Sequence, residues 1–157
     1  ELQVSVSAME QAPDPRREPY DLALFYEAWD GDGQDLIQPV CAPALAARLA
    51  TPGDLAGQTL LHDAVWRQDW RRWLGFAGAP ATVDPARGPA FSLYSLALDA
   101  ALSGSGVLMG RRSLISTHLA DGRLVAPFQL EMPTGDRMAL TQAPAHDRHP
   151  LATPARA

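Results

Sequence analysis

Short apolar runs alternate along this chain with segments of helical period, and this alternation limits the folds open to the chain more than any other feature. The apolar runs are too short for buried helices and are typical of strands; they lie at residues 21–26, 36–41, 59–62, 107–109, 124–128 and 138–141. The helical segments each end near a glycine, and they span residues 69–78, 95–103 and 111–121. Strands that alternate with helices predict an α/β fold in which most strands pair in parallel.

The region before the first long helix adds local expectations. Residues 2–7 alternate apolar and polar side chains, which predicts a half-buried strand. The three prolines of residues 12–19 predict an exposed connection, because each proline removes a backbone donor and disfavours helix in the residue before it. The run at residues 21–26 is almost wholly apolar and predicts a central parallel strand covered on both faces. Residues 51–54, Thr-Pro-Gly-Asp, predict the capped start of a short helix.

The charge of the chain restricts its partners. Thirteen basic and eighteen acidic side chains give a formal net charge of −5 at pH 7, the wrong sign for a surface that grips phosphate backbones. No window approaches the ~20 apolar residues of a membrane span, and the N-terminus lacks the features of a signal peptide. Cys41 is the only cysteine, which excludes an internal disulfide and a cysteine zinc site. We expect a soluble cytoplasmic protein that has no cofactor and no membrane contact.

Several motifs follow one another in a specific order, although each motif alone is weak. They are DLALFY at residues 21–26, PVCAPALA at 39–46, DLAGQTLLHD at 54–63, WRRWL at 70–74, GSGVLMGRR at 104–112 and LADGRLVAPF at 119–128. In this order they resemble the effector-binding domain of LysR-type transcriptional regulators, in particular the branch of the glycine-cleavage activators and β-lactamase regulators. The resemblance implies a two-lobed α/β fold like that of type 2 periplasmic binding proteins. It also implies a small ligand in the cleft and a winged helix-turn-helix at the N-terminus of the full protein.

The resemblance divides the chain into two lobes. Residues 1–37 and 125–157 correspond to an incomplete first lobe, and residues 38–124 to the second lobe. The family's first strand and helix of this domain and its closing helix have no counterpart here, and the segment between Tyr26 and Leu36 is shorter than usual. We expect that the chain is a fragment of a longer protein and that part of the apolar surface of its first lobe is uncovered.

The start of one predicted helix is the main candidate for ligand binding. Ser92, Tyr94 and Ser95 lie just before residues 96–102. Serines at a helix start most simply cap the free amides there. The alternative is that the same helix N-terminus, with its free N–H groups and positive dipole end, faces the cleft and binds a carboxylate or amide oxygen. The family resemblance favours this second interpretation.

Five further residues complete the predicted site. His62 and Asp63 end the strand that enters the second lobe, and in the analogous fold they point toward the cleft; the alternative is a hydrogen-bonded pair at a hinge. Trp66 follows in the next loop and is a candidate lid. Tyr26 ends the strand at residues 21–26, where open parallel sheets place their ligands. Tyr26 and Ser7 are therefore the expected contacts from the first lobe.

Other chemical patterns have simpler interpretations. Ser103 and Ser105 resemble a nucleophile elbow, but a helix precedes them and a strand follows, the reverse of an elbow. His146 and His149 lie among prolines without a third ligand, and we expect no metal there. The tryptophans of the WRRWL motif share one helical face, which favours packing in the core or between subunits. The arginine pairs are interrupted by acidic residues and do not form a DNA-binding stripe.

These observations predict a binding domain without catalytic activity, which senses a small effector for a bacterial LysR-type transcription factor. The effector is expected to be anionic or amino-acid-like and to change the angle between the lobes, and with it the geometry of a homodimer or homotetramer. DNA is contacted only through a helix-turn-helix outside this chain. One alternative is a two-lobed solute-binding protein associated with transport. An enzyme on a related fold is a third option, for which no convincing acid, base or nucleophile cluster is present.

Overall fold

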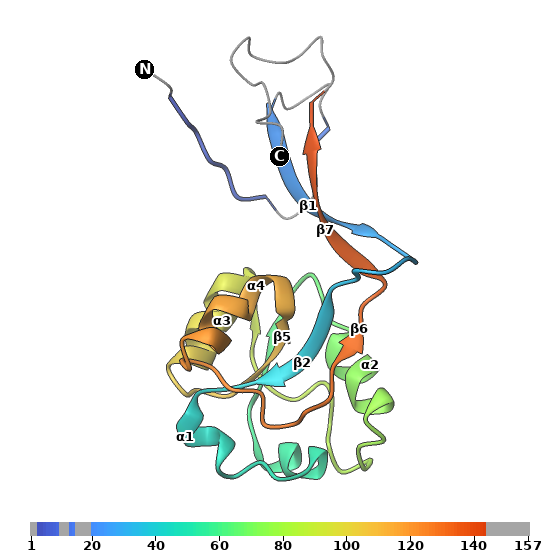
Figure 1. The fold of residues 1–157 in the computed structure, drawn as a ribbon. Coiled ribbons are helices and arrows are strands. Elements are labelled where there is room, and N and C mark those ends of the chain that lie inside the picture. Colours follow the sequence, from blue (N-terminus) through green and yellow to red (C-terminus); the bar gives the residue numbers. More distant parts are fainter. Residues whose placement is uncertain (1–2, 10–12, 15–19, 144–157) are drawn as a thin grey trace.

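The computed structural model describes residues 3–9, 13–14 and 20–143, and it contains two separate sheets (Figure 1). The first is a two-stranded antiparallel arm made of β1 (Leu22–Ala28) and β7 (Asp136–Gln142). The second has five strands in the order β4-β3-β5-β2-β6. Its strands are β2 (Leu36–Val40), β3 (Leu60–Asp63), β4 (Ala90–Phe91), β5 (Val107–Arg111) and β6 (Met132–Pro133).

Helices cover both faces of the five-stranded sheet, α2 on one side and α3 and α4 on the other (Figure 1). The helices are α1 (Pro43–Ala46), the 3-10 turn η1 (Pro52–Gly57), α2 (Asp69–Phe76), α3 (Tyr94–Leu102) and α4 (Arg112–Ala120). Neighbouring strand residues point to opposite faces, so Leu60 packs with Trp70 and Trp73 from α2 while Leu61 packs with residues of α3 and α4. Both faces of the sheet are therefore buried, as the unbroken apolar runs predict.

Several local predictions are confirmed. Helices α2, α3 and α4 each end two residues before a predicted glycine stop. Thr51 and Asp54 form a reciprocal capping box at the start of η1. Trp70 and Trp73 are buried core residues, and their indole N–H groups donate to the carbonyl oxygens of Leu61 and Leu130 at 3.0 and 3.2 Å. The helix ends, the capping box and the shared helical face of Trp70 and Trp73 depend on neighbours in sequence, so they could be predicted from the chain alone.

Strand pairing departs from the prediction. Among the residues that the structure describes, only the pairs β3–β4 and β3–β5 are parallel; β1–β7, β2–β5 and β2–β6 are antiparallel. The expectation of largely parallel pairing was therefore wrong in part. An apolar run shows that both faces of a strand are covered, but it does not show the direction of the neighbouring strands.

The arm corrects the prediction of a central parallel strand at residues 21–26. β1 pairs with β7 alone among the described residues, and the cross-strand pair Leu24 and Leu140 leaves both side chains more than half exposed, at 56% and 66%. The apolar run at residues 21–26 indicates that burial of both faces would be favourable. It does not indicate how many strands pair with this one, because that number depends on distant segments.

Two other predicted strands are absent from the described part of the chain. Residues 3–9 form no strand, and Val4 and Val6 are 73% and 90% exposed, because alternation yields a strand only where a partner supplies backbone hydrogen bonds. In the segment 124–128 only Val125 pairs, in an isolated bridge with Cys41. No helix in the described part is long and apolar enough to cross a membrane.

Candidate ligand-binding site

An aromatic cluster lies where the arm meets the five-stranded unit. It joins Tyr26 of β1, Trp66 of the loop after β3 and Tyr94, the first residue of α3. The ring centroids of Tyr26 and Trp66 are 5.1 Å apart and those of Trp66 and Tyr94 are 5.7 Å apart, both edge to face. This geometry is favourable for aromatic pairs. Three of the residues that the sequence predicted for the site therefore meet, although they lie 40 and 28 positions apart.

Arg111 occupies the centre of this cluster and was not predicted from the sequence. Its guanidinium carbon lies 3.9 Å from the ring centroid of Trp66 and 5.1 Å from that of Tyr26. The side chain is 1% exposed; Nη2 donates to a carboxylate oxygen of Asp69 at 2.8 Å, and Nη1 lies 3.6 Å from a carboxylate oxygen of Asp136. Among the described residues, Nε and Nη1 of Arg111 have no hydrogen-bond partner. Buried donors without acceptors are costly, so these two N–H groups favour an incoming acceptor.

A polar chain holds the arm against the start of α4. Both carboxylate oxygens of Asp35 accept hydrogen bonds from Ser113, one from its amide at 3.0 Å and one from its hydroxyl at 2.7 Å. Since that hydroxyl donates to Asp35, its oxygen accepts from the hydroxyl of Tyr26. The chain Tyr26–Ser113–Asp35 thus joins the arm, α4 and the residue before β2. Neither Asp35 nor Ser113 was predicted as a site residue. The one sequence signal at Asp35 was its position just before the predicted strand at residues 36–41.

Burial sets the ionisation of the cluster. Burial raises the pKa of Tyr26 to about 12 and also raises the pKa of Tyr94, so both phenols remain protonated and able to donate at neutral pH. Burial raises the pKa of Asp69 above its ordinary value, while the positive charges of Arg111 and Arg72 act in the opposite direction. The cluster therefore offers protonated hydroxyls beside the guanidinium of Arg111 and the carboxyl group of Asp69.

His62 and Asp63 have structural hydrogen bonds. The Nε2 atom of His62 lies 3.0 Å from the carbonyl oxygen of Arg87, and because a carbonyl only accepts, Nε2 carries the proton. The carboxylate of Asp63 accepts from the amides of Val65 and Trp66 at 2.7 and 3.1 Å. Asp63 thereby fixes the turn that presents Trp66 to the cluster. Contact of His62 and Asp63 with a ligand stays a prediction.

The predicted serines lie at the surface. Ser92 and Ser95 are exposed on either side of Leu93, which is the N-cap of α3 and makes no side-chain cap. The simpler interpretation, capping by a serine, is therefore not seen. Ser7 is exposed within residues 3–9, and Figure 1 draws this segment away from the five-stranded sheet. Ligand binding by these three serines stays a prediction.

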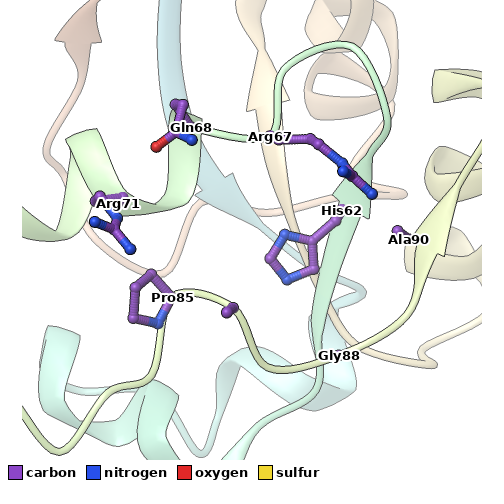
Figure 2. Close-up of a pocket in the computed structure, with 8 residues that line it drawn as sticks. His62, Arg67, Gln68, Arg71, Pro85, Gly88 and Ala90 are labelled. Carbon is purple, nitrogen blue, oxygen red and sulfur yellow. The ribbon is translucent and has the colours of Figure 1, made fainter.

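Two cavities flank β3. A small enclosed one of about 10 Å³ lies between Trp66, Asp69 and Tyr94, room for about one water. A larger open pocket of about 270 Å³ lies between α2 and the segment before β4 (Figure 2). It is lined by His62, Arg67, Gln68, Arg71, Pro85, Ala86, Gly88 and Ala90.

Metal and nucleophile chemistry finds little support in the described residues. They include no group of three or more His, Cys, Asp or Glu side chains that could hold a metal ion. His146 and His149 lie outside the described residues. The hydroxyl of Ser103 donates to the carbonyl oxygen of Asp99 at 2.8 Å, a hydrogen bond at the end of α3.

Comparison with known sequences gives consistent matches. A family profile described as the LysR substrate binding domain matches residues 1–154. The glycine cleavage system transcriptional activator of Escherichia coli (strain K12) is 33% identical over 137 residues, which cover 81% of this chain and 44% of that protein. The HTH-type transcriptional activator AmpR of Rhodobacter capsulatus is 34% identical over 126 residues, which cover 76% of this chain and 43% of that protein. The chain spans less than half the length of these curated relatives.

Solved structures agree. The effector domain of AmpR from Pseudomonas aeruginosa superposes with a TM-score of 0.70 at 27% identity, over 85% of this chain and 67% of that one. The AmpR effector binding domain from Citrobacter freundii gives a TM-score of 0.70 at 26% identity, over 90% and 73% of the two chains. The predicted two-lobed, periplasmic-binding-protein-like α/β fold is thereby confirmed. These relatives are named as transcription regulators.

Proposed function

Because the chain belongs to the LysR substrate-binding domain family, we propose that it is the ligand-sensing part of a bacterial, cytoplasmic LysR-type transcription factor. In this proposal the arm, with residues 1–37 and 125–157, belongs to the first lobe, and residues 38–124 form the second lobe. The effector binds between them, at the junction occupied by Tyr26, Trp66 and Tyr94.

The buried guanidinium of Arg111 is the observation that carries this assignment. Two of its nitrogen atoms lack acceptors while its charge is already shared with Asp69 and Asp136. A carboxylate or carbonyl oxygen of a ligand would accept from these N–H groups. Because Asp35, Asp69 and Asp136 lie nearby, a free dianion would be repelled, and the charges favour an amino-acid-like ligand that carries both signs.

Ligand entry requires a rearrangement of the junction. The enclosed space beside Trp66 is about 10 Å³, far less than the ~300 Å³ of a typical ligand pocket. Trp66 and Tyr26 must therefore separate before an effector is bound, which changes the angle between the arm and the five-stranded unit. A ligand shifts such an equilibrium only by its difference in affinity for the two states, about 5.5 kcal/mol for a change from 1:99 to 99:1.

The proposed output is a change in the assembly of the whole protein. A homodimer or homotetramer would convert the lobe angle into a new spacing of DNA-binding heads, which lie in a helix-turn-helix outside this chain. A transport-associated solute-binding protein is the alternative on the same fold. The gene sequence upstream of Glu1 separates the two, because the regulator requires a helix-turn-helix there and the transport protein an export signal.

A thermal-shift screen of the full-length protein against amino acids, small carboxylates and peptidoglycan fragments tests the proposal. A ligand at 100 times its Kd stabilises the folded state by about 2.7 kcal/mol, which raises the Tm of a domain of this size by about 5–10 °C. A hit whose shift is lost in the variant Trp66→Leu supports binding at the junction. A hit unaffected by Trp66→Leu and by Tyr26→Phe would contradict it.

A further inference from the structure

We propose that the open pocket beside α2 is a second ligand site, which binds a small anion through Arg67 and Arg71. The pocket is separate from the aromatic junction, and the assignment does not depend on what binds there. Its volume of about 270 Å³ makes it much larger than the enclosed cavity at the junction. Figure 2 shows Arg71 on α2, Arg67 on the loop that precedes α2, the imidazole of His62 in the middle and the loop at Pro85 and Gly88 below.

The lining of the pocket is basic although the protein is acidic. The whole chain carries a formal net charge of −5, yet the charged lining residues, Arg67 and Arg71, are both positive and no carboxylate lines the pocket. Neither guanidinium has an ion pair or hydrogen bond in the part of the chain that the structure describes. Arg71 lies in the first turn of α2 and Arg67 lies in the turn before that helix, and both line the pocket. Two positive charges around one pocket repel each other, and a bound anion would offset that repulsion.

The wall opposite the arginines is fixed in place. The amide of His62 donates to the carbonyl oxygen of Pro89 at 3.0 Å, and the imidazole donates to the carbonyl oxygen of Arg87 at the same distance. Gly88 has a φ of +118°, and a Cβ there would lie 1.9 Å from the carbonyl oxygen of Leu60. Only glycine allows the backbone to pass so close to β3, and Gly88 is one of the residues that line the pocket.

The wall formed by α2 is fixed as well. The indole of Trp70 donates to the carbonyl oxygen of Leu61 at 3.0 Å, which ties α2 to β3. Gln68, between the two arginines in sequence, adds an amide that can donate to the same ligand. The backbone of both walls is therefore in place before a ligand binds, and the two exposed arginine side chains are the groups that binding must order.

The chemistry points to anionic oxygen atoms as the ligand groups. A guanidinium binds carboxylate and phosphate oxygens with two parallel hydrogen bonds. The volume is just below the ~300 Å³ at which pockets for drug-sized ligands begin. The site therefore fits a small metabolite with two carboxylates or one phosphate group.

Nuclear magnetic resonance titrations of the full-length protein test the site, with citrate, succinate and inorganic phosphate as separate probes at constant ionic strength. We expect saturable shifts of the Nε–H signals of Arg67 and Arg71 and of the amide of Gly88. The tightest of the three probes identifies carboxylate or phosphate as the preferred group. In the double variant Arg67→Gln/Arg71→Gln, affinity for that probe should fall about tenfold or more, because both charge-assisted contacts to the anion are removed.

A matched control separates a site from general charge. The double variant Arg48→Gln/Arg123→Gln removes the same two charges from exposed positions outside the pocket, and its affinity should stay within about twofold. An equal loss in both double variants, or no saturable shift with any probe, would overturn the proposal. It would also be overturned if no probe binds while Arg67→Gln/Arg71→Gln changes the sedimentation coefficient, because the arginines would then contact protein.

Discussion

Arg111 and Asp69 should be strongly coupled in stability. The guanidinium and the carboxylate are 1% and 6% exposed and are 2.8 Å apart. Breaking such a pair leaves one buried charge without its partner, at a cost of about 3–5 kcal/mol. We expect Arg111→Met to lower the free energy of unfolding by about 3 kcal/mol, near the lower end of that range. The reason is that Arg72 lies 3.4 Å from Asp69 and can partly replace the lost charge. Asp69→Asn should cost a similar amount, because Asp136 lies 3.6 Å from Arg111.

The double variant measures the coupling. If both charges are removed together, no buried ion remains, so Arg111→Met/Asp69→Asn should cost about 2–3 kcal/mol less than the sum of the single variants. Urea unfolding followed by tryptophan fluorescence gives the three free energies of unfolding. The neighbouring pair of Arg112 and Glu131 is more exposed, at 54% and 27%, and Arg112→Met should cost less than about 1 kcal/mol. Single costs below about 1 kcal/mol, or additivity within about 0.5 kcal/mol, would refute the reasoning.

Three further predictions follow from local geometry. Gly88→Ala should lower the free energy of unfolding by on the order of 3 kcal/mol or more, because its Cβ would meet the carbonyl of Leu60. Gly57 has open space around it, so Gly57→Ala should change the free energy of unfolding in urea by less than about 1 kcal/mol. Equal costs of the two variants would contradict this prediction. Burial raises the pKa of Cys41 to about 11, so its thiol should react with a disulfide reagent at about pH 8 at least 100-fold more slowly in the folded than in the unfolded protein; similar rates would contradict that burial. Hydrogen bonds from the Thr51 and Ala50 amides lower the pKa of Asp54 in the folded protein. The carboxylate therefore stabilises the fold above its ordinary pKa of 3.8, and this stabilisation is lost as the pH falls through the lower folded value. Urea midpoints from about pH 2 to 6 should show the loss in the unchanged protein, and those of Asp54→Ala should not.

The parts of the fold that could be predicted depend on nearby residues. Capping, glycine stops and the shared face of Trp70 and Trp73 are set within a few positions, and the structure has them where the sequence placed them. Strand partners are set by segments far apart in the chain. The arm pairs Leu22 with Gln142, 120 positions away, and no local pattern at residues 21–26 encodes that choice.

The centre of the candidate site was missed for a related reason. Arg111 and Arg112 form a pair that resembles a solvated surface charge, and most such pairs are exposed. The strand at residues 107–109 continues to Arg111, however, and Asp69 receives the guanidinium from 42 positions away. A charged residue directly after a buried strand was the available signal. Trp66 and Tyr94 were predicted from a loop after a strand and from a helix start that the family resemblance placed at the cleft. Tyr26 was predicted as the end of a parallel strand, and that reason was wrong, because Tyr26 lies within the antiparallel strand β1.

Hydrogen exchange of the full-length protein, with and without the tightest ligand from the screen, tests the central claim most directly. The account predicts that the ligand changes amide exchange in β1, in the loop after β3 that carries Trp66, at the start of α3 and at the junction of β5 and α4. Those four segments surround Arg111 and are remote in sequence. Protection confined to residues 67–71 and 85–90, or absent from β1 and the Trp66 loop, would contradict an effector site at the junction of the lobes.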